Sequence, residues 1–178
     1  KKLMVLLILI NMNSTQSQFM FVDGSHIYNK YKKHNKGYVI LGPPASGKTT
    51  FIRNQQIQNW TDTDDLFYDL NLSWHLNETN ENDFKLNYLR ADYLLEQSKL
   101  LGIRLIGSLY YNYIPDAIVI LDEDLHSKYI DQRNKLDKTN TLDKKFVFNV
   151  KTDLIEKSKQ FNIPIFKSIN DAIKHLEH

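Results

Sequence analysis

The sequence contains no cysteine, and only four of its 23 lysine and arginine residues are arginine. The absence of cysteine excludes disulfide bonds, cysteine-based zinc sites and thiol catalysis. The formal net charge of +2 over 178 residues is too small to indicate nucleic acid as the main partner. Arginine normally supplies bidentate contacts to phosphate, so the candidates for such contacts are few. They are Arg53, Arg90, Arg104 and Arg133.

Long hydrophobic runs are also absent. The apolar run at residues 3–10 has eight residues, whereas a membrane-spanning helix needs about 20. Two lysines before this run resemble the start of a secretory signal, but no Ala-x-Ala cleavage site follows in residues 11–18. We therefore expect no transmembrane span and a cytoplasmic protein, with export as the alternative.

The rest of the chain has the pattern of one α/β domain. A hydrophobic fraction of 42% in 178 residues is enough for one sizeable core. We expect an N-terminal extension over residues 1–36 and the domain over 37–178, where apolar runs alternate with helical patterns, as in a parallel sheet. Strands are predicted at 38–41, up to Trp60, at 104–107, at 117–121 and at 163–166. Helices are predicted at 50–57, 85–101, 123–135, up to 161 and after a Ser168 cap, with an Asn-rich loop or lid at 71–84.

Two of the six glycines belong to one motif. Residues 42–49, Gly-Pro-Pro-Ala-Ser-Gly-Lys-Thr, match G-x-x-x-x-G-K-[ST], the loop that binds nucleotide phosphates. The predicted strand before the motif and the predicted helix after it are the context that this loop requires. We therefore expect a nucleotide-binding loop.

The residue types in the motif predict their contacts. Pro43 and Pro44 have no backbone N–H, so the amides of residues 45–50 must bind the anion at the positive end of a helix. Lys48 would reach the β- and γ-phosphates, and the Thr49 hydroxyl would ligate Mg²⁺. Thr50 either contacts the α-phosphate or packs within the helix. The expected nucleotide contacts are Gly42, Ala45, Ser46, Gly47, Lys48, Thr49 and Thr50.

An acidic turn follows at residues 60–66, Trp-Thr-Asp-Thr-Asp-Asp-Leu, at the expected end of the second strand. Residues at the carboxyl ends of parallel strands face the ligand crevice. The turn resembles the Asp-Thr-Asp of shikimate kinases and the Asp-Gly-Asp of gluconate kinases. This resemblance implies that Asp62 holds the water shell of Mg²⁺ and that Asp64 grips or deprotonates the acceptor hydroxyl. The alternative is a turn that only caps a helix, and Asp65 is the residue expected to cap it.

Two arginines are candidates for contacts to the acceptor and to the transferred group. Arg90 lies in the predicted helix 85–101, where nucleotide and shikimate kinases bind the phosphate or carboxylate of the acceptor. A surface arginine paired with a carboxylate is the alternative. Residues 121–133 resemble the segment that leads into the lid of adenylate and gluconate kinases. That resemblance implies that Arg133 covers the transferred phosphoryl group, with Lys128 as a weaker helper.

The same segment has a second interpretation. The strand at 117–121 followed by Asp122 and Glu123 also fits a Walker B motif, in which Asp122 binds the metal and Glu123 activates water for hydrolysis. Only one further strand is predicted after it, so a motor-type ATPase core would be incomplete. The two carboxylates can also simply cap a helix. The histidines show no metal-ligand spacing.

In this order the motifs resemble the P-loop kinase group of adenylate, shikimate and gluconate kinases over residues 37–178. The resemblance implies a three-layer P-loop NTPase fold with a five-stranded parallel sheet of order 2-3-1-4-5 and lid segments that close over ATP and Mg²⁺. We expect a kinase that phosphorylates a small acceptor, a nucleoside monophosphate or nucleoside. The alternatives are a shikimate- or gluconate-type metabolite acceptor, an ATPase using Asp122 and Glu123, and a non-catalytic ATP-binding module. A polynucleotide 5′-hydroxyl is disfavoured by the near-neutral charge.

Overall fold

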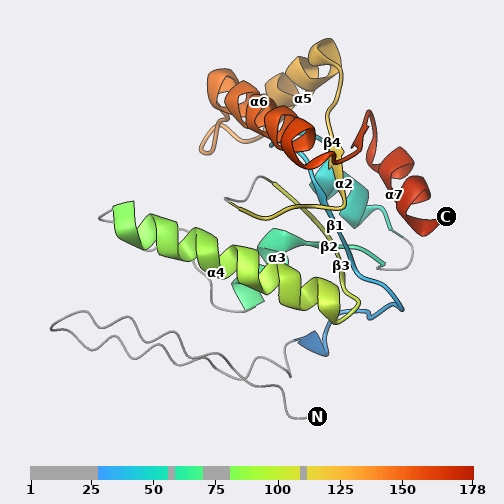
Figure 1. Cartoon of the computed structure of the whole chain (residues 1–178). Helices are drawn as coiled ribbons and strands as arrows, with labels where there is room; N and C mark the ends of the chain where they lie inside the picture. Colours follow the sequence, from blue (N-terminus) through green and yellow to red (C-terminus); the bar gives the residue numbers. More distant parts are fainter. Residues whose placement is uncertain (1–27, 56–58, 70–80, 109–111) are drawn as a thin grey trace, which may run out of the picture.

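The computed structural model describes residues 28–55, 59–69, 81–108 and 112–178, with only the backbone of 81–87 (Figure 1). Strands and helices alternate along these residues, as predicted for an α/β fold. The strands are β1 (Tyr38–Leu41), β2 (Thr61–Asp62), β3 (Arg104–Gly107), β4 (Ala117–Val119) and β5 (Ile165–Phe166). The helices are α2 (Lys48–Arg53), α3 (Thr63–Asp69), α4 (Glu81–Leu100), α5 (Glu123–Leu136), α6 (Lys144–Phe161) and α7 (Ile169–Glu177). No helix among the described residues is long and apolar enough to cross a membrane.

The five strands form one sheet of order β2-β3-β1-β4-β5, and all its strand pairs are parallel. β1 is the central strand, with Val39 opposite Leu105 of β3 and Ile40 opposite Ala117 of β4. The predicted sheet order is confirmed, and it is consistent with a P-loop NTPase-like fold. β1 therefore delivers the loop at residues 42–49 to the middle of the sheet's carboxyl edge.

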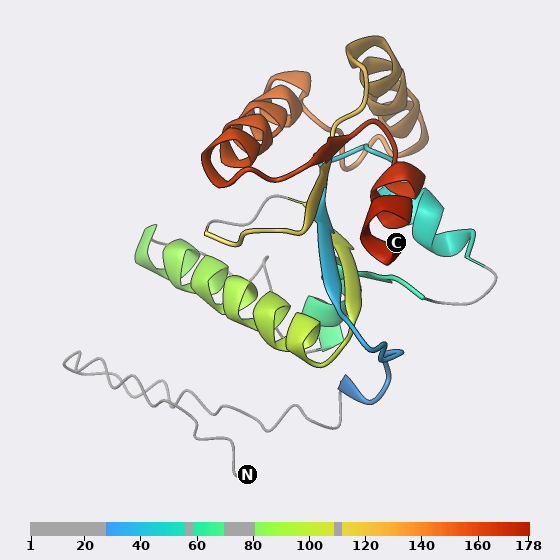
Figure 2. The same ribbon diagram turned by 45° about the vertical axis from the view of Figure 1, so that its right-hand side comes forward.

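Side-chain alternation along the strands builds a helix layer on each face. Val39 and Leu41 join a core cluster with residues of α4 and α6. Tyr38 and Ile40 point to the opposite face and join a cluster that contains residues of α7. Figure 2 shows α4 and α6 on one side of the sheet and α2 and α7 on the other. The predicted three layers are confirmed, and the core on the first face reaches back to Tyr28.

The second strand and the first helix differ from the prediction at one shared turn. α2 ends at Arg53 rather than near residue 57, and β2 begins after Trp60 rather than ending there. The cause is Gln55, whose Oε1 accepts hydrogen bonds from Asn59 N at 3.0 Å and Trp60 N at 2.9 Å. Its Nε2 donates to Trp60 O at 3.0 Å. Because the turn uses the backbone of Trp60, sheet pairing starts at Thr61.

The longest helix also departs from its predicted packing. α4 begins at Glu81, so residues 81–84 are helical rather than part of the expected loop, whose residues 71–80 lie outside the described part. Helical spacing in the sequence predicts one broad apolar face that includes Leu89, Tyr93 and Leu100, but these three residues are exposed, and the buried residues among the described side chains of α4 are Ala91, Leu95 and Ser98. The apolar pattern gave large side chains more weight than Ala91 and Ser98. The buried face of α4 is therefore rotated around the helix from the predicted apolar face.

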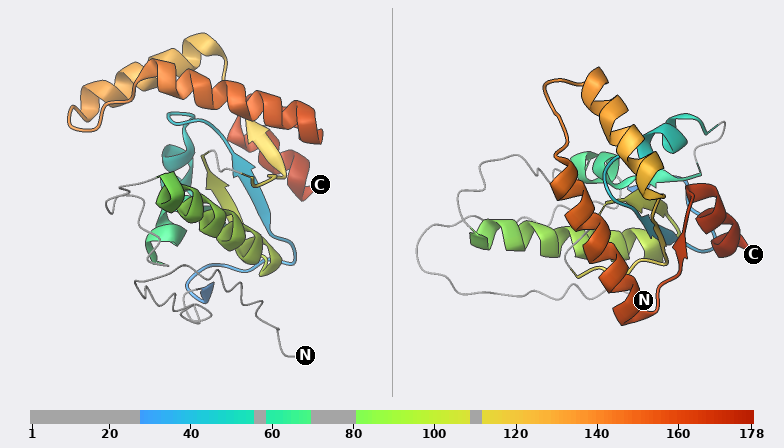
Figure 3. Two further views of the ribbon diagram at one scale, coloured as in Figure 1. Left: turned by 60° about the vertical axis from the view of Figure 1, so that its left-hand side comes forward. Right: turned by 90° about the horizontal axis from the view of Figure 1, so that it is seen from above.

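The C-terminal elements agree closely with the sequence pattern. α5 starts at Glu123 and α6 ends at Phe161, both as predicted. β5 lies at the edge of the sheet, where the preceding Pro164 costs no ladder hydrogen bond. Ser168 caps α7 by accepting a hydrogen bond from Asp171 N. Figures 1 and 3 show α5 and α6 side by side at the carboxyl edge of the sheet.

Candidate phosphate-binding site

The loop after β1 has a backbone shaped for close approach of an anion. It is anchored where Gly42 N donates to Gly107 O of β3 at 2.9 Å. Two residues then adopt left-handed conformations, Ala45 with φ 60° and Gly47 with φ 87°. Alternation of right- and left-handed residues turns successive amides to one side, which is how a backbone nest is made. A left-handed alanine costs free energy, and such strain is concentrated at ligand sites.

Helix α2 continues this arrangement. Gly47 is its N-cap and supplies no side-chain hydrogen bond. The first amides of a helix have no acceptor within the helix, so those of residues 48–50 need a partner from outside. Thr49 and Thr50 are exposed on this first turn. Both hydroxyls are therefore accessible from solvent, as the predicted Mg²⁺ and α-phosphate contacts require.

The Lys48 ammonium group lies inside the loop. Its Nζ donates hydrogen bonds to Gly42 O at 2.9 Å, Pro43 O at 2.7 Å and Ser46 Oγ at 3.3 Å. Burial lowers the pKa of Lys48 to about 8, the carboxylates of Asp62 and Asp64 raise it, and the Arg133 charge lowers it further. Neutral acceptors hold a desolvated cation here, which an incoming phosphate would stabilise.

This burial predicts a pH dependence of stability. Below pH 8 Lys48 is charged in the folded and in the unfolded protein, and the folded state is destabilised by burial of this charge. Between about pH 8 and pH 10.5, the ordinary pKa of lysine, Lys48 releases its proton in the folded protein but retains it in the unfolded chain. The free energy of unfolding should therefore rise with pH in this window, relative to a Lys48→Met variant. Urea unfolding of both proteins from pH 7 to 11 measures this difference, and a difference that stays constant with pH would contradict the burial of the charge.

The acidic turn at the end of β2 lies beside the loop. Asp62 caps α3, because its Oδ1 accepts a hydrogen bond from Asp64 N at 3.0 Å. The expectation that Asp65 is the cap was therefore wrong; Asp65 is exposed in the first turn of α3. Burial raises the pKa of the Asp62 carboxyl, the hydrogen bond from Asp64 N lowers it, the Asp64 carboxylate raises it, and the Lys48 charge lowers it. The two aspartates and the lysine thus form one electrostatic group.

Close packing of Thr63 on Gly107 holds the turn in this position. Thr63 is fully buried, and a Cβ added to Gly107 would lie 2.6 Å from Thr63 Cγ2. Gly107 O is also the acceptor for Gly42 N. One glycine in β3 therefore connects the phosphate loop to the turn that carries Asp62 and Asp64.

A methyl group at Gly107 should disturb this contact. We expect Gly107→Ala to lower the free energy of unfolding by about 1–3 kcal/mol, the usual cost of overpacking. The change is measured by urea unfolding. Adding Thr63→Ala, which removes both Oγ1 and Cγ2 of the crowded side chain, should recover part of the loss. Wild-type stability in Gly107→Ala would contradict the close approach.

Helix α5 supplies a further positive charge that acts on the loop lysine. Arg133 is half-buried and acts on the pKa of Lys48, so it belongs with the group formed by Lys48, Asp62 and Asp64. Lys128 is exposed on the same helix. Asp122 is different: its side chain is 71% exposed and forms an ion pair with Lys167.

Other predicted residues are not brought into this group. Arg90 is half-buried on α4 and is not among the charges that shift the pKa of Lys48. Ser46, by contrast, is buried within the loop, and its Oγ accepts a hydrogen bond from Lys48 Nζ. His126, for which the sequence gave no role, is fully buried, and its ring contacts the loop at Pro44 O. Its only sequence signal is its spacing with Ile130 and Arg133 along one face of α5.

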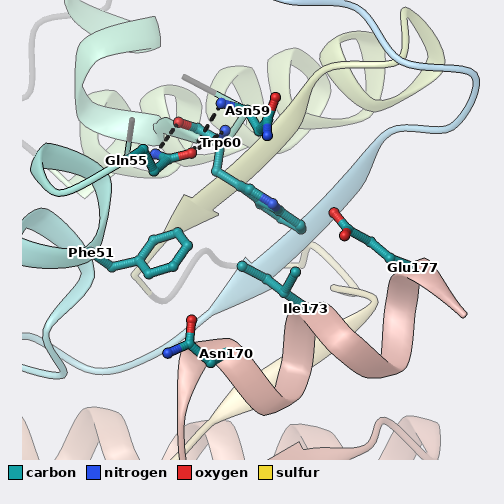
Figure 4. Close-up of a pocket in the computed structure, with 7 residues that line it drawn as sticks. All are labelled: Phe51, Gln55, Asn59, Trp60, Asn170, Ile173 and Glu177. Atoms are coloured by element: carbon teal, nitrogen blue, oxygen red, sulfur yellow. Dashed lines mark hydrogen bonds between the residues drawn. The ribbon is translucent and has the colours of Figure 1, made fainter. Parts of the chain in front are cut away.

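The structure also has a cavity of about 400 Å³ between α2 and α7 (Figure 4). Phe51, Trp60 and Ile173 form its apolar walls, and several of its polar groups already have partners within the protein. Gln55 binds the backbone of Trp60, and Glu177 pairs with Arg104. None of the residues 42–49 lines this cavity, so it is separate from the phosphate loop.

No protein-family model matches this sequence, and no curated protein matches it. Its chemistry is therefore inferred from its own residues. The loop offers backbone amides and a cation to a phosphate chain, and the carboxylates of Asp62 and Asp64 lie close to it.

The residues present fit Mg²⁺. The Thr49 hydroxyl and the Asp62 carboxylate are oxygen ligands, the type that this ion prefers. No group of three or more histidine, aspartate or glutamate residues in the described part could hold a metal alone.

Proposed function

We propose that this protein is a kinase that transfers the γ-phosphate of ATP to a small acceptor, a nucleoside monophosphate or nucleoside. The observation that carries the proposal is the set of charges around Lys48. A buried cation within a phosphate-loop backbone is acted on by two carboxylates from β2–α3 and by an arginine from α5. Phosphoryl transfer needs this combination: a phosphate cradle, a metal carboxylate, a group for the acceptor hydroxyl and a cation over the transferred group.

Each residue has one task in this proposal. The amides of residues 45–50 and the Lys48 ammonium group bind the phosphates and orient the γ-phosphoryl group. Thr49 and Asp62 would hold Mg²⁺, which neutralises charge on the phosphate oxygens when it is bound. With a nucleoside as acceptor, Asp64 accepts the proton of the attacking hydroxyl as its oxygen bonds to phosphorus and the bond to the β-phosphate oxygen breaks; with a nucleoside monophosphate the attacking phosphate oxygen carries no proton to remove. Arg133 stabilises the charge on the transferred group.

The hydrolase alternative has less support. It requires Asp122 at the metal, but the Asp122 side chain is mostly exposed and paired with Lys167. The pKa of Asp122 is lowered, first by the hydrogen bond from Lys167 and then by its charge. Asp122 also does not act on the pKa of Lys48, whereas Asp62 and Asp64 do. The carboxylates beside the loop are those assigned to the kinase.

The acceptor distinguishes the remaining alternatives. The protein would be incubated with ATP, Mg²⁺ and pools of nucleosides, nucleoside monophosphates and hydroxylated metabolites, and the products identified by mass spectrometry. We expect a phosphorylated nucleoside or nucleotide. A phosphorylated sugar acid or shikimate-like compound would support the metabolite kinase instead. Binding of ATP without a phosphorylated product from any pool would contradict the proposal.

A further inference from the structure

His126 makes a direct contact with the phosphate loop from α5. Its side chain is fully buried, and Nε2 lies 2.8 Å from Pro44 O. A carbonyl oxygen can only accept, so Nε2 carries the proton and donates it. Pro44 immediately precedes Ala45, the residue with φ 60°. The hydrogen bond therefore fixes the backbone where the loop enters its left-handed conformation.

The surroundings of the ring do not account for a histidine by packing alone. Nδ1 is buried and has no hydrogen-bond partner among the described residues. The ring meets Phe148 of α6 edge to face, with centroids 6.0 Å apart. Burial lowers the pKa of His126, the Pro44 contact raises it, and Lys151 and Lys48 lower it. An apolar ring would avoid the cost of a half-satisfied imidazole, so the hydrogen bond to Pro44 is the reason for a polar side chain.

The same face of α5 carries Arg133. His126, Ile130 and Arg133 are spaced by four and three residues, which places them on one face of the helix. His126 and Ile130 are fully buried, and Arg133 is half-buried with its charge acting on Lys48. α5 therefore meets the loop at two points, a hydrogen bond at Pro44 and a charge near the ammonium group.

We propose that His126 is a positioning residue that fastens α5 to the phosphate loop, holding the loop in its phosphate-binding shape and Arg133 over the transferred group. This inference rests on the proposed kinase function. His126 acts through the Pro44 carbonyl and touches no reacting atom. Losing its donor removes the hydrogen bond to the half-buried Pro44 and frees both the loop and the helix.

Two variants separate the hydrogen bond from the space that the ring fills. His126→Phe keeps a ring but has no donor, whereas His126→Gln supplies an amide N–H. We expect His126→Phe to raise the Kd for ATP with Mg²⁺ about tenfold and to lower kcat as well, because a lost buried hydrogen bond is of this size. His126→Gln should restore most of both. Phe148→Leu, which alters the packing and keeps the donor, is the control variant.

Calorimetry for Kd, initial rates for kcat and urea unfolding for stability together test the inference. Equal Kd and kcat in wild type and His126→Phe would overturn it. So would a Phe148→Leu variant that loses as much affinity as His126→Phe at equal loss of stability, because that would make the role merely structural. Nitrogen NMR of the wild-type imidazole should find the proton on Nε2, and a proton on Nδ1 alone would remove the hydrogen bond.

The binding and NMR measurements need no turnover, so they separate this inference from the kinase proposal. Wild-type protein that binds ATP but phosphorylates no acceptor would contradict the kinase assignment. A tenfold change in Kd between wild type and His126→Phe would in that case still support the contact between His126 and the loop.

Discussion

Replacing Lys48 with methionine should lower the rate of phosphoryl transfer about a thousandfold while the protein remains folded. Lys48 Nζ sits among Gly42 O, Pro43 O and Ser46 Oγ, where an incoming phosphate meets a desolvated cation. In such a site an ammonium group stabilises the phosphoryl charge far more strongly than it would in water. Initial rates with saturating ATP and acceptor measure the loss.

The structure supplies the control for this variant. Methionine fills a similar volume and removes a charge whose burial the folded protein must bear, but it leaves Gly42 O and Pro43 O without this donor, so urea unfolding of the variant is measured beside its rate. Lys159→Met removes an exposed charge from the last turn of α6 and should leave transfer unchanged. A Lys48→Met protein that is folded and transfers phosphate at the wild-type rate would contradict the assignment of the loop.

The second large effect is expected for Asp62→Asn, which should lower transfer a hundredfold to a thousandfold. Asn is as good an N-cap as Asp, so the hydrogen bond from Asp64 N to residue 62 is kept. Only the negative charge is lost, and with it the proposed hold on Mg²⁺. Rates measured across a series of Mg²⁺ concentrations should give a raised requirement for the ion.

Two comparison variants make this result specific. Asp65→Asn removes an exposed carboxylate from the same first turn of α3 and should change neither the rate nor the Mg²⁺ requirement. Asp62→Ala should in addition lower the free energy of unfolding by about 1 kcal/mol, because it also removes the side-chain cap of α3. Wild-type transfer by Asp62→Asn at low Mg²⁺ would remove Asp62 from the metal site.

The fold was largely predictable because its strands are short, buried apolar runs. The bounds of β1 and β3 match their predicted ranges, and Gly102 ends the turn after α4 with φ 82°, as a glycine C-cap should. β2 was misplaced because a side chain, Gln55, pairs with the backbone of Trp60. A hydrogen bond from a nearby side chain to the backbone leaves no periodic signal in a sequence.

The candidate site was predictable for those residues that belong to a sequence motif at the carboxyl end of a strand. Lys48 follows β1, and Asp62 and Asp64 lie at the end of β2; these parallel strands are separated only by β3, so all three residues lie at the same carboxyl edge of the sheet. The position of Arg133 depends on the packing of α5, and its role over the transferred group stays a prediction. His126 was missed because its role depends on one hydrogen bond across the chain, from α5 to Pro44. The position of Arg90 relative to the acceptor stays a prediction.

The most direct test of the account is the fate of the γ-phosphate of labelled ATP. The protein would be incubated with γ-labelled ATP, Mg²⁺ and pooled nucleosides and nucleoside monophosphates, and the label followed by chromatography. We predict that the label moves to an acceptor and that this transfer is lost in Lys48→Met. Label found only as inorganic phosphate, and lost in Glu123→Gln but kept in Asp62→Asn, would contradict the account and identify a hydrolase.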